Sequence, residues 1–390
     1  MKKIIILIGV LFTQALSGQS YVQQVLILNE GYFDYNTNQI VEPVTVGSYD
    51  PVTQIYSTVD TITGARFASD IIIDGDYFFV AADNTLYKYD LDTYSIINSQ
   101  TIPGIRNIVI HKNNIVVTRG EYLTDYDSYL QVYSKIDLSL ITQFDTITGP
   151  KWPTQNMIVT DSIVYVAINN GYEWGNEKGL IGILDIKNIT YINEIDLGPD
   201  GKNPDNMVFD GMNIYTVNNK DWSGASISQI DINTNSTLTF NIGNINIGCG
   251  TSCLRDNKIN YQMSGDNQLF EWDPLFTTTI GTTPGLNNNY YELAVDNSNN
   301  LYATSTDWVS YGTVHIYDSN NMLINSFSCG VSLGSIAFDN RSTPVSINEL
   351  HYIDIVDHNI YNLSGKQVNY STISIPGIYI VNGIKTYISK

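Results

Sequence analysis

Short apolar runs separated by tight polar turns recur along most of the chain. In the clearest copy, residues 206–218, Met207-Val208-Phe209 is one apolar run and Asp210-Gly211 turns the chain. A second apolar stretch, Ile214 to Val217, follows the turn. This order predicts two short antiparallel strands joined by a hairpin turn. The pattern alternates with a period of two throughout, and no stretch of useful length has a helical period.

The hairpin pattern returns at intervals of about 40 to 50 residues, the period expected of four-stranded propeller blades. Each full copy precedes an alternating third strand that typically ends in Asp, as at residues 86–90, and then a polar turn and a fourth strand, as at residues 189–195. The other copies are residues 71–80, 108–117, 157–166, 252–261 and 293–302, with half a copy at residues 335–339.

The half copy lacks its three partner strands, and the start of the chain supplies them at residues 25–28, 44–50 and 54–59. Joining the two ends removes the exposed edges that an open array would carry. The predicted fold class is therefore all-β: a seven-bladed β-propeller over residues 19–340, closed by N- and C-terminal strands of one blade. A β-sandwich is the alternative, but it does not predict a regular period of this length.

The N-terminus has the order of an export signal. Basic residues at Lys2 and Lys3 precede an apolar segment at residues 4–12, and small residues follow at positions 15–18. This order predicts a signal peptide over residues 1–18 and an exported protein, extracellular or on the outer cell surface. The alternative is a buried first strand.

Composition narrows the possible partners. The chain has 39 acidic and 19 basic residues and a formal net charge of −20, so nucleic acid is not an expected partner. An odd number of cysteines, Cys249, Cys253 and Cys329, leaves at least one thiol unpaired within the chain. The four histidines are scattered, and neither a metal site nor a cofactor is predicted.

The rhythm of residues 21–340 resembles the seven-bladed propellers of the YVTN type, which are common in exported bacterial proteins. The segment Leu28-Asn29-Glu30-Gly31-Tyr32 is also similar to the start of a propeller family on Bacteroidetes cell surfaces. Some members of that family capture cobalamin for an outer-membrane transporter. The resemblance therefore implies an outer-membrane transporter as a possible partner.

The C-terminal segment, residues 341–390, departs from this rhythm. Residues 360–368 read as strand, Gly turn and strand, and residues 376–388 as a hairpin that turns at Asn382-Gly383. Residues 361–368 and 377–381 resemble the C-terminal sorting domain of type IX secretion cargo, which implies the type IX secretion machinery as a partner. The alternative is a small structural β appendage.

Aromatic residues gather in the loops between second and third strands and in the loops that enter each first strand. Four of the five Trp residues lie in such loops, all predicted on one face. Aromatic planes beside amides and carboxylates suit a sugar or a flat ring, although the rings could instead pack the loops together. The predicted ligand-binding residues are Tyr32, Arg66, Tyr122, Trp152, Trp174, Asn219, Trp222 and Trp308.

Catalysis has weaker support. No nucleophile elbow, phosphate loop or metal-ligand cluster occurs, and no catalytic residue is assigned. The leading hypothesis is a non-catalytic binding protein for a small molecule or glycan. One alternative is a polysaccharide-acting enzyme that uses loop carboxylates, and another is a protein-interaction scaffold for an outer-membrane transporter of the cobalamin-capture type. The candidate carboxylates are Glu30, Glu121, Asp127, Glu173, Asp221 and Asp307.

Overall fold

The structure is a computed structural model of the chain. It describes residues 20–247, 251–342, 348–349, 359–374, 377–382 and 384–388. The predicted signal peptide at residues 1–18 and Cys249 lie outside these ranges. The chain divides into two compact units, of which the larger is Val22–Asn340.

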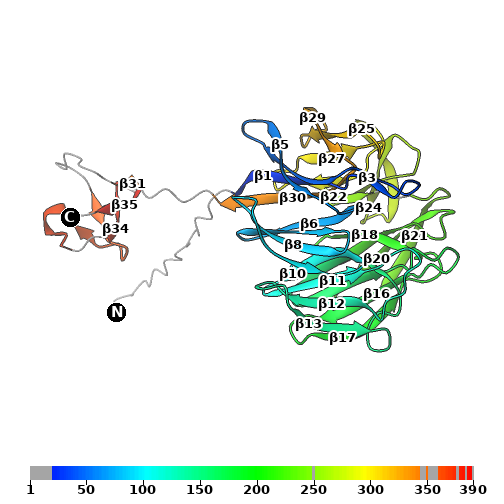
Figure 1. Cartoon of the computed structure of the whole chain (residues 1–390). Coiled ribbons are helices and arrows are strands. Elements are labelled where there is room, and N and C mark those ends of the chain that lie inside the picture. Colours follow the sequence, from blue (N-terminus) through cyan, green and yellow to red (C-terminus); the bar gives the residue numbers. More distant parts are fainter. Residues whose placement is uncertain are drawn as a thin grey trace, which may run out of the picture. The chain divides into compact units, whose positions relative to one another are not determined.

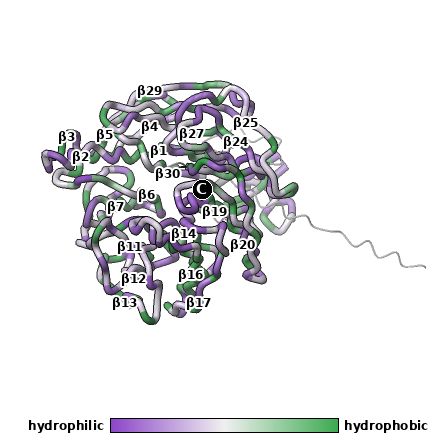
Figure 2. Tube along the Cα trace, turned by 90° about the vertical axis from the view of Figure 1, so that its right-hand side faces the viewer, coloured by the Kyte–Doolittle hydropathy of each residue, from purple (hydrophilic) through white to green (hydrophobic). Residues whose placement is uncertain are grey.

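The larger unit consists of repeated four-stranded antiparallel sheets, the arrangement of a β-propeller (Figure 1). In Figure 2 the sheets follow one another in chain order around a common centre. The same view shows hydrophobic and hydrophilic residues interleaved along the strands, in line with the period-two pattern.

The sheets group the strands of the larger unit as follows. One sheet has the order β30 (Leu333–Ser342), β1 (Ser20–Asn29), β4 (Val44–Asp50) and β5 (Ile55–Ile62). In the others, the strands follow chain order: β6 (Ala68–Asp74), β7 (Tyr77–Ala82), β8 (Thr85–Asp90) and β9 (Ile96–Thr101); β10 (Ile105–His111), β11 (Asn114–Arg119), β12 (Ser128–Ser134) and β13 (Leu140–Asp145); β14 (Thr154–Thr160), β15 (Ile163–Ile168), β16 (Leu180–Asp185) and β17 (Thr190–Asp196); β18 (Pro204–Phe209), β19 (Asn213–Asn218), β20 (Ala225–Asp231) and β21 (Thr237–Gly243); β22 (Ser252–Arg255), β23 (Lys258–Gln262), β24 (Gln268–Asp273) and β25 (Thr278–Asn287); and β26 (Leu293–Val295), β27 (Leu301–Ser305), β28 (Tyr311–Tyr317) and β29 (Leu323–Val331).

The hairpin predicted at residues 206–218 is confirmed as β18 and β19, with Phe209 opposite Ile214. Asp210 closes the turn because its Oδ1 accepts hydrogen bonds from the backbone N–H groups of Met212 (2.8 Å) and Asn213 (2.7 Å). Apolar side chains on both strands then face the neighbouring sheets.

Hydrophobic clusters lie between consecutive sheets. Between the sheets that begin with β10 and β14, for example, Val116 and Val132 pack with Met157 and Val166. Burying a side chain of this size contributes about 1.5–3 kcal/mol. A further cluster joins Val314 and Ile316 of β28 to Val25 and Ile27 of β1.

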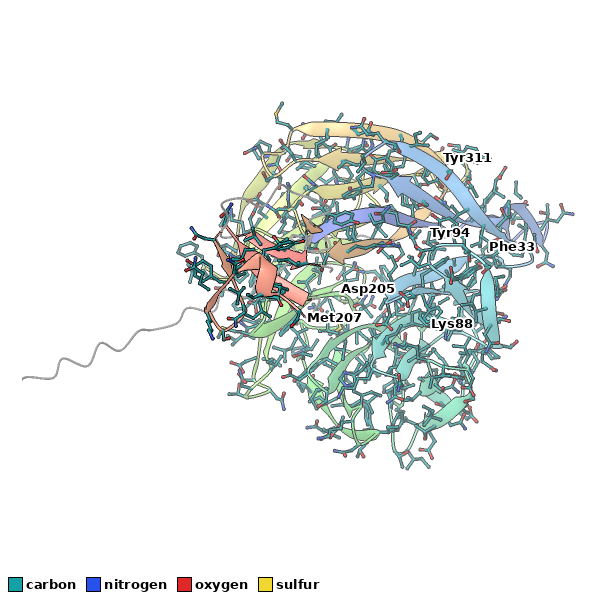
Figure 3. All side chains as sticks on the ribbon, turned by 90° about the vertical axis from the view of Figure 1, so that its left-hand side faces the viewer. Phe33, Lys88, Tyr94, Asp205, Met207 and Tyr311 are labelled. Atoms are coloured by element: carbon teal, nitrogen blue, oxygen red, sulfur yellow. The ribbon has the colours of Figure 1, made fainter. Side chains whose placement is uncertain are left out.

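Polar side chains also link neighbouring sheets. The Tyr94 hydroxyl donates a hydrogen bond to Gln24 Oε1 of β1 at 2.8 Å. Lys88 of β8, labelled in Figure 3, donates from Nζ to the carbonyl oxygens of Lys135 (2.9 Å) and Ile136 (3.2 Å), between β12 and β13 of the next sheet. These bonds hold the sheet that begins with β6 against the sheets on both sides of it.

The predicted partner strands at residues 25–28 and 335–339 lie side by side in β1 and β30. Gln24 Nε2 also donates to Asp339 Oδ2 at 3.2 Å. β30 continues through Ser342, beyond the predicted propeller boundary at residue 340.

A short hairpin, β2 (Tyr32–Asp34) and β3 (Gln39–Glu42), was not predicted and lies between β1 and β4. Its turn is closed by Asp34, which accepts hydrogen bonds from Asn36 N (2.9 Å) and Thr37 Oγ1 (2.8 Å). The hairpin brings Tyr35 to the central cavity described below.

The smaller unit contains a sheet in the order β31 (Asn348–Glu349), β35 (Ile384–Ile388), β34 (Gly377–Val381), β32 (Ile360–Tyr361) and β33 (Gln367–Val368). A 3-10 helix, η1 (Tyr370–Thr372), lies between β33 and β34. The two predicted strand pairs are present, with Tyr361 opposite Gln367 and Val381 opposite Ile384. Ile360, Ile373, Val381 and Ile388 form its core. No helix among the described residues of the chain is long and apolar enough to cross a membrane.

Candidate functional site: a central cavity lined by carboxylates

The first strands of the sheets surround a cavity of about 650 Å³. In β6, β10, β14 and β18 the pairing register with the second strand shifts near the start of the strand. A bulge of this kind places an extra residue and re-aims the side chains beside it. At each of these shifts, two adjacent residues line the cavity.

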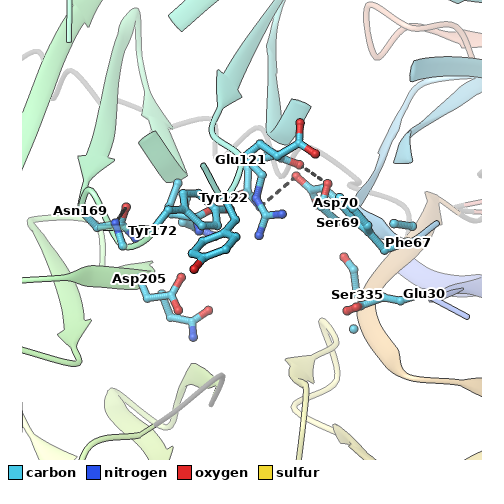
Figure 4. Close-up of a pocket in the computed structure, with 18 of the residues that line it drawn as sticks. Glu30, Phe67, Ser69, Asp70, Glu121, Tyr122, Asn169, Tyr172, Asp205 and Ser335 are labelled. Carbon is cyan, nitrogen blue, oxygen red and sulfur yellow. Dashed lines mark hydrogen bonds between the residues drawn. The ribbon is translucent and has the colours of Figure 1, made fainter. Parts of the chain in front are cut away.

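The lining pairs occupy the same place in each repeat, immediately before a run of three apolar residues in the first strand. Figure 4 shows Asp70, Asp205 and Ser335 reaching a common space from different strands, together with Glu30, which follows β1. The pairs are Ser69-Asp70, Arg106-Asn107, Gln155-Asn156, Asp205-Asn206, Tyr291-Glu292 and Gly334-Ser335.

Side chains of the lining also tie one first strand to the next. Ser69 Oγ donates to the carbonyl oxygen of Arg106 at 2.6 Å, and Asp70 Oδ2 accepts from Ile108 N at 2.8 Å. Thr251 Oγ1 donates to Glu292 Oε2 at 3.2 Å. The positions of these two acids are therefore set by neighbouring strands rather than by flexible loops.

Four carboxyl groups of the cavity have raised pKa values. Burial is the main cause, and it raises the pKa of Glu30 to about 7, of Asp70 and Asp205 to about 6, and of Glu292 to about 8. For Glu292 the charges of the other three acids raise the pKa further. Each carboxyl group is enclosed by protein and keeps a partly exposed surface toward the cavity. Glu30 and Glu292 therefore hold protons near neutral pH, whereas Asp70 and Asp205 ionise below it.

Arg106 is a cation of the cavity lining that acts on this acidic group. Its charge lowers the pKa of Glu30 and of Asp205, which opposes the effect of burial. The guanidinium lies over the rings of Phe67 (5.9 Å) and Tyr172 (5.5 Å). Its Nε atom is buried and has no hydrogen-bond partner among the described residues.

A second cation, Arg66, is neutralised at the edge of the cavity. It pairs with Asp83 at 2.6 Å and with Glu121 at 3.0 Å, and these bonds raise the pKa of the guanidinium. Tyr126 donates its hydroxyl to the other oxygen of Glu121 at 3.0 Å. Arg66 is therefore held as part of the cavity wall.

Asn203 supplies an amide to the cavity. The residue is only 2% exposed, and its Nδ2 has no hydrogen-bond partner among the described residues. Its backbone is fixed in the left-handed region (φ 56°) by a 2.7 Å bond from its N–H to the Lys178 carbonyl. A buried amide donor without a partner costs free energy unless a ligand or water accepts its hydrogen bond.

Three of the predicted binding residues, Arg66, Tyr122 and Trp222, line this cavity together. Trp222 is 36% exposed, and its loop is fixed by a 2.9 Å bond from its N–H to the Asn219 carbonyl. Trp308 lines a separate cavity of about 270 Å³. The structure therefore divides the predicted aromatic surface between two cavities.

The other four predicted residues line neither cavity. Trp152 lies beneath the ammonium groups of Lys151 (5.0 Å) and Lys178 (4.6 Å), and Trp174 is 83% exposed. Tyr32 is paired with Glu42 in the β2–β3 hairpin. Asn219 is buried, and its Oδ1 accepts a hydrogen bond from Ile247 N at 2.9 Å.

The sequence analysis did not single out Asp70, Arg106, Asn203, Asp205 or Glu292. The signal that could have found four of them is their shared position in the repeat: Asp70, Arg106, Asp205 and Glu292 all lie one or two residues before the run of three apolar residues in a first strand. Asn203 carries no comparable signal, since only the folded loop shows that its amide is buried.

The chemistry available in the cavity is hydrogen bonding, charge and aromatic contact. Within the described ranges, no group of three or more His, Cys, Asp and Glu side chains is placed to hold a metal ion. The two described cysteines, Cys253 and Cys329, are buried free thiols in the hydrophobic clusters and lie outside the cavity.

Comparison with known proteins defines the fold. No family model and no curated protein matches the chain. Among solved structures, it is similar to a hypothetical selenium-binding protein from Sulfolobus tokodaii, with 8% identity, 82% of this chain and 94% of that chain covered, and a TM-score of 0.62. It is also similar to U3-55K, with 10% identity, 72% and 86% coverage and a TM-score of 0.54. At these identities the likeness shows the fold alone, and it fits the β-propeller arrangement of the sheets.

Proposed function

We propose that the larger unit is a non-catalytic binding domain that captures a hydroxyl-rich small molecule or glycan, uncharged or cationic, in the central cavity. The observation that carries this proposal is the enclosure of Glu30, Asp70, Asp205 and Glu292 in one cavity beside aromatic rings. Carboxyl and amide groups bond sugar hydroxyls in both directions, and aromatic faces cover the apolar faces of sugar rings. The cavity volume falls within the range of about 300–1,000 Å³ that is typical of ligand sites.

Charge excludes several ligand classes. The cavity is lined by five acidic side chains, Glu30, Asp70, Glu121, Asp205 and Glu292, and by two arginines, Arg66 and Arg106. With Glu30 and Glu292 protonated, the lining carries 2 − 3 = −1, and with all five acids ionised it carries 2 − 5 = −3, in a protein of net charge −20. Phosphorylated ligands, nucleic acid and uronic acid polymers would be repelled.

Isothermal titration calorimetry with the full chain tests the proposal. The titrants are glucose, xylose, mannose, N-acetylglucosamine and glucosamine, and short oligomers of each. The double substitution Glu30→Gln and Glu292→Gln keeps the shape of the cavity and removes both acids, so affinity should fall about tenfold or more, or about 1.4 kcal/mol. Glu194→Gln, at an exposed carboxylate that accepts from Tyr191, is the matched control. Binding that is unchanged in the double variant would place the site elsewhere.

A polysaccharide-acting enzyme is the second candidate. Its support is the raised pKa of Glu292, about 8, beside acids that ionise at lower pH, because a carboxyl group that stays protonated near neutral pH can act as a general acid. Incubation with a panel of polysaccharides separates the two candidates. New reducing ends that disappear in Glu292→Gln would support the enzyme, and their absence with retained binding would support the binding protein.

We further propose that the sheets form a seven-bladed ring closed by one blade that both ends of the chain share, as in propellers of the YVTN type. The support is the position of β30 beside β1 and the cluster that joins β28 to β1. Circular permutation tests this proposal: new ends in the turn at Asp210-Gly211, with the old ends linked, should give a folded protein. Failure to fold would argue against a closed ring.

Export and surface sorting are also proposed, with residues 1–18 as the signal peptide and residues 341–390 as a type IX sorting domain. The support for sorting is the pair of hairpins in the smaller unit at the positions of the resembling segments. Deleting residues 341–390 should leave the protein in the periplasm of a host with this secretion system. A pulldown of the full chain from outer membranes tests the proposed transporter partner.

A further inference from the structure

We infer that the ligand is a short oligosaccharide that spans two neighbouring cavities joined at Tyr291. This inference rests on the proposed function and adds the shape and length of the ligand. The first cavity is the central one, and the second is the smaller cavity lined by Trp308.

Tyr291 belongs to the lining of both cavities. Its hydroxyl donates a 2.8 Å hydrogen bond to Glu30 Oε1 in the central cavity. Its ring packs edge-on against Trp308, with the centroids 6.0 Å apart and an interplanar angle of 80°. One side chain, fixed at its hydroxyl and at its ring, therefore forms the wall common to both cavities.

The two volumes favour a single ligand whose larger part occupies the central cavity and whose smaller part occupies the second. The central cavity, about 650 Å³, has room for a complete small ligand, whereas the second, about 270 Å³, falls below the usual range of about 300–1,000 Å³. The smaller cavity suits one ring of a longer molecule. Chains of linked sugars present such rings at regular spacing.

The second cavity also has the groups that a sugar ring requires. The Trp308 side chain is 48% exposed, so its ring is not held in place by burial in a hydrophobic core. Its loop is held by Thr306 Oγ1, which accepts from Trp308 N at 2.9 Å, and by Asp307 Oδ1, which accepts from Ser310 N at 2.7 Å. Ser264 and Asn289 lie on the same lining and can bond hydroxyls.

Calorimetric titration of the full chain with oligomers of one to four sugars tests the inference. The probes are the gluco-, xylo-, manno- and chito-oligosaccharide series. We expect affinity to rise at least tenfold between one ring and the length that reaches Trp308. Trp308→Ala should remove that gain and leave the affinity for the single sugar within twofold, whereas Trp308→Phe should retain part of the gain. Trp174→Ala, at an exposed ring outside both cavities, is the matched control.

The outcomes distinguish failure of the two-cavity ligand from failure of the proposed binding function. The two-cavity ligand would be ruled out if affinity did not depend on the length of the oligosaccharide, or if the gain in affinity with length survived in Trp308→Ala. Either result would leave the proposed binding of ligand in the central cavity standing. If no single sugar and no oligomer binds, the proposed function itself fails and the inference fails with it. Equal unfolding temperatures of the variants would show that a lost gain reflects lost contact and not lost folding.

Discussion

The Tyr291 hydroxyl donates a hydrogen bond to Glu30 Oε1 at 2.8 Å, across 261 positions of sequence. The bond joins the loop that follows β1 to the residues just before β26, so the acidic lining depends on segments far apart in the sequence. It also lowers the pKa of Glu30, against the larger effect of burial. The same hydrogen bond therefore influences the ionisation of Glu30 and links two distant parts of the chain.

Tyr291→Phe removes this hydrogen bond and keeps the ring against Trp308. The pKa of Glu30, about 7 in the native protein, should rise by about one to two, because a hydrogen bond to a charged acceptor is worth about 1.5–3 kcal/mol. Carboxyl-carbon NMR titration measures the change. Tyr311→Phe, at an exposed hydroxyl outside the cavities, should leave the midpoint unchanged. An unshifted midpoint in Tyr291→Phe would rule out the bond in solution.

Stability should fall as pH rises through the range in which the cavity acids ionise. Burial raises the pKa of Glu292 from its ordinary value of 4.5 to about 8, so between these values the folded protein holds a proton that the unfolded chain releases. The stabilising contribution is complete below pH 4.5 and lost as pH passes 8. Glu292→Gln should make the protein more stable than the native form at pH 8.5 by about 1–2 kcal/mol, since water in the cavity screens part of the burial effect.

Urea unfolding at several pH values measures this effect. The slope against pH should become shallower in Glu292→Gln without vanishing, because Glu30, Asp70 and Asp205 also have raised pKa values and act in the same direction. Identical slopes in the two proteins would mean that Glu292 ionises at its ordinary pH in the folded state.

Gly334 leaves the space that the Glu30 carboxyl group occupies. A Cβ at this position would lie 1.8 Å from Glu30 Oε1, so Gly334→Ala must displace the acid from the cavity lining. We expect a destabilisation of about 1–3 kcal/mol and weaker ligand binding. Gly211→Ala provides the contrast, since nothing lies near its Cβ position and only its φ of 98° is strained. Full binding by Gly334→Ala would show that Glu30 is not needed.

Trp272 tests the packing between sheets. It is fully buried in β24, with edge-on contact to Tyr215 (5.8 Å), and its Nε1 has no hydrogen-bond partner among the described residues. Trp272→Phe should therefore cost much less than Trp272→Ala, which we expect to cost about 3–5 kcal/mol. Denaturant unfolding of both variants measures the difference. Similar losses would show that the indole nitrogen is bonded after all.

The repeating hairpins could be predicted because their signals are local. The Asp210-Gly211 turn between two alternating runs fixes β18 and β19 without reference to the rest of the chain. The incomplete copy at residues 335–339 required partner strands, and the start of the chain offered the only unassigned ones. Local signals and one unpaired strand were therefore enough to predict the strands of the four-stranded sheets and their pairing, but not the β2–β3 hairpin.

The cavity could not be predicted to the same depth, because side-chain direction depends on the folded loop. Trp174 and Trp222 follow similar strands and occur in similar loops, yet Trp222 lines the cavity and Trp174 is turned to solvent. Asp205 reads as an ordinary loop acid until the register shift in β18 places it in the lining. The contact between Glu30 and Tyr291 joins residues that no local pattern relates.

Binding of sugars to the central cavity is the most direct test of this account. Calorimetric titration of the native full chain and of the Glu30→Gln, Glu292→Gln double variant, at pH 7 and with every sugar series in the panel, provides the measurement. The account predicts at least one sugar that binds the native protein and binds the double variant about tenfold more weakly. Equal affinity in the two proteins, or no binding to the native chain by any sugar, would contradict it.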